Sequence, residues 1–205
     1  DGSKVKHENL LRNDISNRTF YTREDFEKDR KDADFRLFTE RVVKRMNAAV
    51  DSVESVARRF SFDDEERRIA VNNTKLQFAF WLFEYPQFKS GELSTYSSKH
   101  KGGWQSLPEQ DREMEAISDV RNYAFVKSLP LSDSTCLASR YFPYFIQSYE
   151  HAHIFNSDQY LYYGTSPSAI AKMDSAFMKK EQAITGHMRP SLFMDIAMQR
   201  RHYEP

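Results

Sequence analysis

The side chains best suited to chemistry in this chain are one cysteine, a histidine pair and a run of acidic residues. Cys136 is the only cysteine among 205 residues. An intramolecular disulfide, a Cys-x-x-Cys redox pair and a cysteine-rich zinc site are therefore excluded. A lone thiol becomes a nucleophile only beside a base and positive charge, and the sequence shows neither near Cys136. We expect Cys136 to be a small, partly buried side chain near the start of a helix.

The histidines and the acidic run do not have the spacing of a metal site. His151 and His153 are two residues apart, so on a helix they point about 200° apart, whereas ligands on one face are three or four residues apart. The acidic residues 63–66 lack the alternating oxygen ligands and central glycine of a calcium loop, and they suit the positive end of a helix. We predict no catalytic, metal-binding or cofactor-binding residue.

Aromatic residues are abundant, at 14% of the chain. Most fall at helical core positions, and 30 Lys and Arg are balanced by 30 Asp and Glu, so we expect no nucleic-acid partner. A tyrosine group and two loop aromatics are candidates for an exposed contact surface for a protein or peptide, with ordinary packing as the alternative. These possible partner-contact residues are Tyr96, Trp104, Tyr160, Tyr162 and Tyr163.

These candidates must be positioned by helices, because helical periodicity dominates the chain. Residues 1–21 are polar and aperiodic, which predicts an irregular lead-in or linker before a helical domain over residues 22–205. Thr22 and Asp25 have the spacing of a capping box. From residue 35 to residue 60, apolar residues recur in steps of three and four, which predicts one long amphipathic helix over about 23–60.

The rest of the chain predicts further helices with breaks between them. A second helix, introduced by a capping pattern at Ser61–Asp64, should stop before Pro86, and residues 86–105 should form a loop. We expect a helix at about 109–127, with Met114, Ile117, Val120, Ala124 and Phe125 facing inward. The next helix, at about 134–155, should be kinked by Pro143 or should begin later than residue 134. Two more are expected at about 168–184 and 190–201.

The predicted fold class is all-α, an irregular bundle of five to seven helices in one domain. No alternating strand pattern persists, and no stretch has the 18 or more apolar residues that a membrane-spanning segment needs. The chain begins with Asp1 rather than Met, which suits a processed or excised piece, and an arbitrary boundary of the given segment explains it equally well.

Three segments together resemble a known helical region. They are Phe-Trp-Leu-Phe-Glu-Tyr-Pro at residues 80–86, the stretch from Leu-Pro-Leu-Ser-Asp to Phe-Ile-Gln-Ser-Tyr at residues 129–149, and Ala-Ile-Thr-Gly-His-Met-Arg-Pro-Ser-Leu-Phe at residues 183–193. In order and spacing they resemble the helical region that precedes the thioredoxin domain in TlpA-like thiol–disulfide oxidoreductases of the Bacteroidetes cell envelope. The resemblance covers about residues 22–200.

This resemblance implies a periplasmic or cell-envelope location and a thioredoxin domain with a Trp-Cys-x-x-Cys site, in which one thiolate attacks a disulfide and the second resolves it. Nothing in this sequence matches that motif, so no catalytic residue is carried over. The chain would be a non-catalytic accessory module that contacts the adjoining thioredoxin domain or another protein. The alternatives are a stand-alone secreted or envelope helical adaptor and an enzyme of another type. The oligomeric state is left open.

Overall fold

The first helix that the structure describes begins where the capping box predicts. A computed structural model describes residues 20–99, 108–131, 133–150, 152, 179 and 182–183. Helix α3 spans Arg23–Arg30. The Thr22 hydroxyl accepts from the Asp25 N–H (3.1 Å), and the Asp25 carboxylate accepts from the Thr22 N–H (3.0 Å). The capping box thereby pairs two backbone amides that the helix start leaves unsatisfied.

The prediction of a single helix over 23–60 is wrong, because the helix is interrupted between Arg30 and Phe35. Asp32 has φ of 54°, in the left-handed region that aspartate tolerates better than most residues. Helix α4 then spans Phe35–Arg59, and its N-cap Asp34 accepts from the Leu37 N–H at 2.8 Å. The apolar stripe begins only at Phe35, so the stripe did not support a helix over residues 23–34. The residues before and after the break are nevertheless buried in one core.

The apolar stripe of α4 is confirmed over most of its length. The buried residues of this helix follow one face in steps of three or four, and they are Phe35, Phe38, Val42, Met46, Ala49, Val53 and Ala57. At the end the buried face moves to Ala57, while Val56 and Phe60 are only partly buried.

Helix α5 spans Asp64–Lys99 and is longer than predicted. Its cap is Asp63 rather than Ser61: the Asp63 carboxylate accepts from the Glu66 N–H (2.8 Å), and the Glu66 carboxylate accepts from the Asp63 N–H (3.0 Å). Ser61 instead has φ of 52° in the turn that ends α4. The loop predicted over 86–105 is wrong as far as Lys99, because the helix continues through Pro86.

Burial explains why Pro86 does not end the helix. A proline inside a helix removes one backbone hydrogen bond and crowds the preceding turn. Here Leu82, Phe83, Tyr85 and Pro86 are all buried, so packing offsets that cost.

The apolar character of residues 76–83, which predicts burial on several sides, is confirmed: Leu76, Phe78, Ala79, Leu82 and Phe83 are all in the core.

The helix expected over 109–127 is two elements. Helix α6 spans Pro108–Ser118, and after Asp119 a 3-10 helix, η2, spans Val120–Ser128. The change of helix type alters the inward face: Tyr123, Phe125 and Val126 are buried, while Ala124, expected inside, is exposed. Ile117 is buried as predicted.

The next predicted helix also divides. A 3-10 helix, η3, spans Ser134–Ala138, and α7 spans Phe142–Glu150. Pro143 is in the first turn of α7, where its missing N–H removes no helical bond. The later start is therefore confirmed. The helices expected at 168–184 and 190–201 lie almost wholly outside the described residues.

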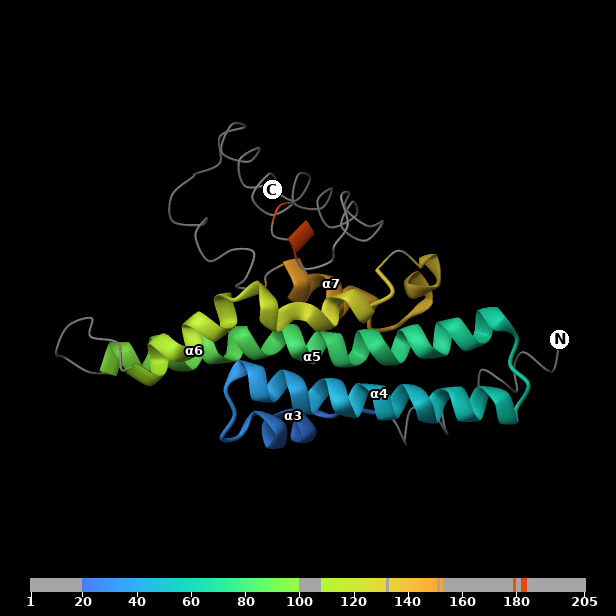
Figure 1. Cartoon of the computed structure of the whole chain (residues 1–205), viewed down its shortest axis with the longest axis horizontal. Coiled ribbons are helices and arrows are strands. Elements are labelled where there is room, and N and C mark those ends of the chain that lie inside the picture. The colour runs from blue at the N-terminus through green and yellow to red at the C-terminus, as the bar shows by residue number, and fades with distance from the viewer. Residues whose placement is uncertain are drawn as a thin grey trace.

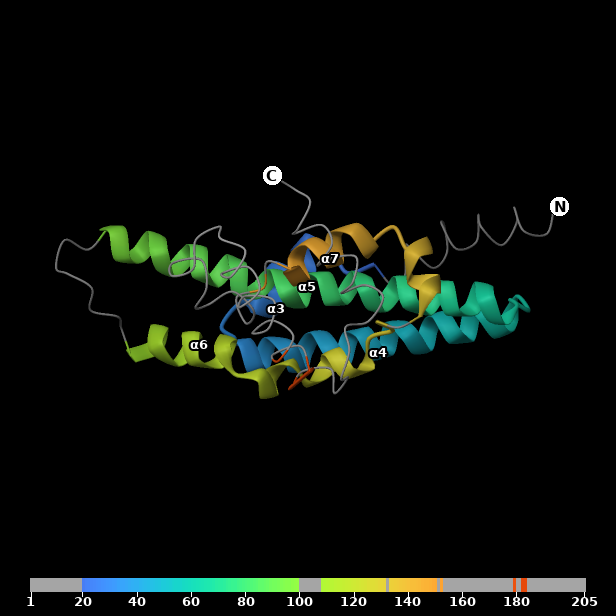
Figure 2. The same ribbon diagram turned by 90° about the horizontal axis from the view of Figure 1, so that it is seen from above.

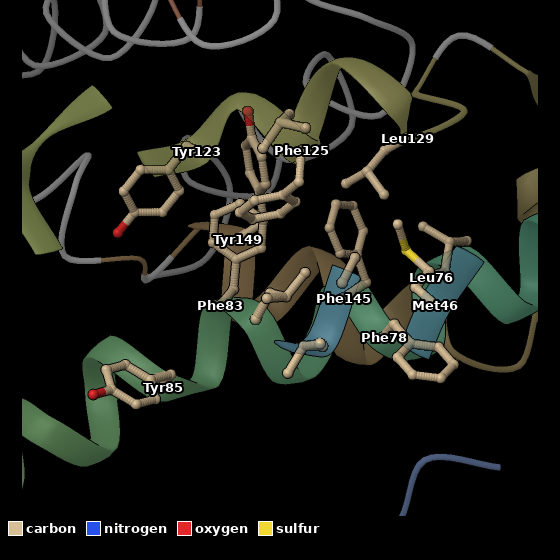
Figure 3. Close-up of a cluster of buried hydrophobic side chains, with 14 of the residues drawn as sticks. Met46, Leu76, Phe78, Phe83, Tyr85, Tyr123, Phe125, Leu129, Phe145 and Tyr149 are labelled. Carbon is tan, nitrogen blue, oxygen red and sulfur yellow. The ribbon is translucent and has the colours of Figure 1, made fainter. Parts of the chain in front are cut away.

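The described elements form an irregular all-α bundle around α5 (Figures 1 and 2). Helix α4 runs antiparallel to α5 along most of its length, and α7 and η3 pack on another side of α5. Helix α3 lies against α4, and α5 extends past the start of α4 toward the beginning of α6. Aromatic rings dominate the core: Figure 3 shows Phe83 of α5 beside Tyr149 and near Phe125 and Tyr123.

Candidate interaction surface

Two aromatic residues of α5, Phe80 and Trp81, pack against the edge of the core and stay partly exposed. Phe80, Trp81 and Glu84 are partly exposed, at the spacing of neighbours on one helical face. The Trp81 indole N–H donates to the Tyr21 carbonyl at 3.2 Å, and Glu84 accepts from the Ser148 hydroxyl of α7. This face of α5 is therefore bordered by the segment before α3 on one side and by α7 on the other.

Aromatic residues from both borders extend this face. The Tyr144 ring of α7 lies 6.2 Å from the Phe80 ring, and Tyr144 is 58% exposed. The Phe20 ring lies 6.2 Å from the Tyr141 ring, and Phe20 is 44% exposed. We call these residues, together with the arginine described next, the aromatic surface: Phe20, Phe80, Trp81, Arg140, Tyr141 and Tyr144.

Arg140 lies over two rings of this surface. Its guanidinium carbon is 5.5 Å from the centre of the Phe20 ring and 4.9 Å from that of the Tyr141 ring. Its Nη2 donates to the Tyr141 hydroxyl oxygen at 2.9 Å, and the Gln77 side-chain amide donates to the same oxygen at 3.1 Å. Cation–π contacts of this kind hold the guanidinium plane in place at an exposed position.

Polar side chains of α5 hold the 133–141 segment in place. The Asn72 amide donates to the Asp133 carboxylate (3.1 Å) and to the Thr135 hydroxyl (2.9 Å). The Ser139 hydroxyl donates to Asn73 Oδ1 (2.8 Å) and accepts from the Tyr141 N–H (3.1 Å). These contacts fix the chain immediately before and after Arg140, so the aromatic surface has a rigid base.

Asp133 is the cap that begins this segment. Its carboxylate accepts from the Thr135 N–H at 3.0 Å and from the Thr135 hydroxyl at 2.7 Å. The Thr135 backbone N–H, followed by its hydroxyl, lowers the pKa of the Asp133 carboxyl, because both stabilise the ionised form.

Cys136 belongs to the same segment, and its side chain is buried more deeply than expected. Its thiol donates to the Pro130 carbonyl at 3.3 Å, and the residue is 0% exposed. Burial, followed by the negative charge of Asp133, raises its pKa to about 12. A thiol with this pKa is protonated at neutral pH and is a poor nucleophile.

A second polar cluster joins three helices at the far side of the core. The Tyr85 hydroxyl of α5 lies 2.8 Å from the Ala33 carbonyl and 2.9 Å from Glu113 Oε1 of α6. The Phe35 backbone N–H at the start of α4 acts to lower the pKa of Glu113. Burial is the main reason why the pKa of Glu113 is raised. These contacts connect α5 with α6 and with the turn before α4.

Most of the partner-contact residues predicted from sequence lie outside the described residues. The contact residues outside the described part are Trp104, Tyr160, Tyr162 and Tyr163. The histidine pair, His151 and His153, also lies outside it. Tyr96 lies on α5, so it is helical rather than in a loop. Within the part of the chain that the structure describes, no group of three or more His, Cys, Asp or Glu could hold a metal ion.

The sequence did not reveal the aromatic surface because its residues fall in three separate predicted segments. Phe20 belongs to the predicted lead-in, Phe80 and Trp81 to the second predicted helix, and the other three residues to one helix predicted over 134–155. In that register Tyr141 and Tyr144 count as core positions, but α7 begins only at Phe142 and turns Phe145, Ile146 and Tyr149 inward instead. The signal in the sequence was Pro143 directly after an Arg-Tyr-Phe triplet, since a proline favours the first turn.

Among the helices that the structure describes, none is long and apolar enough to cross a membrane. Comparisons of the chain with known protein families, with curated proteins and with solved structures give no match.

Proposed function

We propose that this chain is a non-catalytic helical module that acts through protein contacts made by the aromatic surface. The observation that carries this proposal is the Arg140 guanidinium held over the Phe20 and Tyr141 rings next to the largely exposed Tyr144. Tyr, Trp and Arg are the residues that most often dominate binding energy at protein interfaces. A rigid base under them lowers the entropy lost on binding.

The partner is proposed from the resemblance described above. By that resemblance the partner is an adjoining thioredoxin domain of a thiol–disulfide oxidoreductase in the periplasm or cell envelope. The second candidate is a stand-alone secreted or envelope adaptor that uses the same surface for a separate protein. Both candidates place the binding energy in the same residues, so one experiment addresses both.

The test is site-specific photo-crosslinking in the full natural protein, in its own cells. p-Benzoylphenylalanine replaces Tyr144 in one variant and Leu37 in the control, because Leu37 is an exposed apolar residue on α4. We expect a protein cross-link from position 144 and none from position 37. A cross-link to a domain with Trp-Cys-x-x-Cys supports the first candidate, and one to another protein supports the second. Equal cross-linking at both positions, or none at position 144, contradicts the proposal.

A further inference from the structure

The donors of Arg140 are only partly used within the bundle. A guanidinium has five N–H donors and no acceptor. In the structure one of them is accepted by the Tyr141 hydroxyl, and among the described residues no carboxylate lies within 4.0 Å of Arg140. Arg140 is exposed, so most of its donors remain available to a binding partner.

Tyr141 adds a further donor beside it. Its hydroxyl oxygen accepts from both Arg140 and Gln77, and a phenol oxygen has two acceptor sites and one hydrogen. With both acceptor sites occupied, the hydroxyl hydrogen remains to be donated. Arg140 and Tyr141 thus offer positive charge and N–H and O–H donors at one place, which suits a carboxylate.

The rings around these donors suit an apolar neighbour of that carboxylate. Phe20 and Tyr144 keep large exposed areas, and the Phe20 ring lies next to the Tyr141 ring. An aliphatic or aromatic side chain next to an acidic one would bury area against these rings while the carboxylate meets the guanidinium.

We infer that the aromatic surface binds a segment of a partner protein in which an Asp or Glu side chain adjoins an apolar residue. The carboxylate pairs with Arg140 and accepts from Tyr141, and the apolar side chain packs on Phe20 and Tyr144. This inference rests on the proposed function, because it specifies the partner of the same surface.

The test is a selection of phage-displayed random twelve-residue peptides on the full chain. Enriched peptides are then synthesised, each with a matched form in which Asp or Glu becomes Asn or Gln, and their Kd is measured by fluorescence polarisation. The protein variants are Arg140→Gln, Tyr141→Phe and Tyr144→Ala. Arg59→Gln is the matched control, since Arg59 stacks on the Phe60 ring in a similar way at 5.5 Å.

We expect enriched peptides to carry an acidic residue next to an apolar one. Neutralising that residue, or the Arg140→Gln change, should weaken binding about tenfold, as loss of a charge-assisted hydrogen bond does. Tyr141→Phe should weaken binding less, Arg59→Gln should not weaken it, and the advantage of the acidic form should shrink with added salt.

Two results would overturn this inference, and they are distinguishable. In the first result, the peptides lose affinity for Tyr144→Ala but show no preference for an acidic residue and no effect of Arg140→Gln. That result would contradict the carboxylate partner and would still agree with the proposed function. A selection without enriched peptides, or with peptides insensitive to Tyr144→Ala, would remove both.

Discussion

At the scale of single residues, the thiol of Cys136 gives a direct test of burial. Because its pKa is raised to about 12, only about one thiol in ten thousand is ionised at pH 8. We expect Cys136 in the folded chain to react with a disulfide reagent such as Ellman's reagent orders of magnitude more slowly than in guanidinium. If the Cys136 thiol reacted at the same rate in both states, it would not be enclosed in the core.

Glu113 gives a pH-dependent prediction. Its pKa is raised mainly by burial, so the folded chain keeps this proton at pH values where the unfolded chain has released it. The native state then binds more protons, and the free energy of unfolding falls as pH rises through the range immediately above about 4.3, the ordinary Glu value.

Glu113→Gln removes this dependence. The stability of the variant relative to the wild type should therefore rise with pH in that range, as measured by urea unfolding at a series of pH values. Glu115→Gln, which changes an exposed carboxyl on the same helix, controls for the loss of one charge. A difference between Glu113→Gln and wild type that stays constant with pH would contradict the raised pKa.

At the scale of elements, the sequence predicted which helices exist and which faces they bury better than it predicted where they begin and end. The stripe from Phe35 to Val53 predicted the buried face of α4, since a spacing of three and four residues follows directly from helical geometry. The break at Asp32 was missed because the prediction joined the capping box at Thr22 to a stripe that begins only at Phe35, directly after the cap residue Asp34. The passage of α5 through Pro86 could not be predicted, since it depends on tertiary burial that local rules omit.

The break before α4 depends on its N-cap, which gives a prediction for this element. Asp34→Ala removes the acceptor for the Leu37 N–H and should lower the free energy of unfolding by about 1 kcal/mol, within a range of about 0.5–2 kcal/mol. In a chain of this length the melting temperature should fall by about 2–4 °C. Asp51→Ala, an exposed site in the middle of α4, should change stability by no more than about 0.5 kcal/mol. Equal effects would mean that the cap does not define the helix start.

At the scale of the whole molecule, α5 connects the core to the aromatic surface. Its inner face carries Phe83, and its outer face carries Phe80 and Trp81. The surface also needs residues far away along the chain: Gln77 and Tyr141, which hydrogen-bond, are 64 positions apart. Sequence spacing predicts neighbours along one helix, but it does not predict which helices meet. For this reason the all-α class could be predicted and the aromatic surface could not.

The two faces of α5 should respond differently to truncation. Phe83 is 0% exposed and lies within 6.0 Å, ring centre to ring centre, of Phe145 and Tyr149 of α7 as well as of Tyr123 and Phe125 of η2. Phe83→Ala should lower the free energy of unfolding by about 3–5 kcal/mol, because it would leave a cavity where α5, α7 and η2 meet. Phe80 is only partly buried, so Phe80→Ala should cost clearly less while still weakening partner binding. Urea unfolding measures both costs. If Phe80→Ala proved as destabilising as Phe83→Ala, Phe80 would belong to the core, and the outer face of α5 would not be available to a partner.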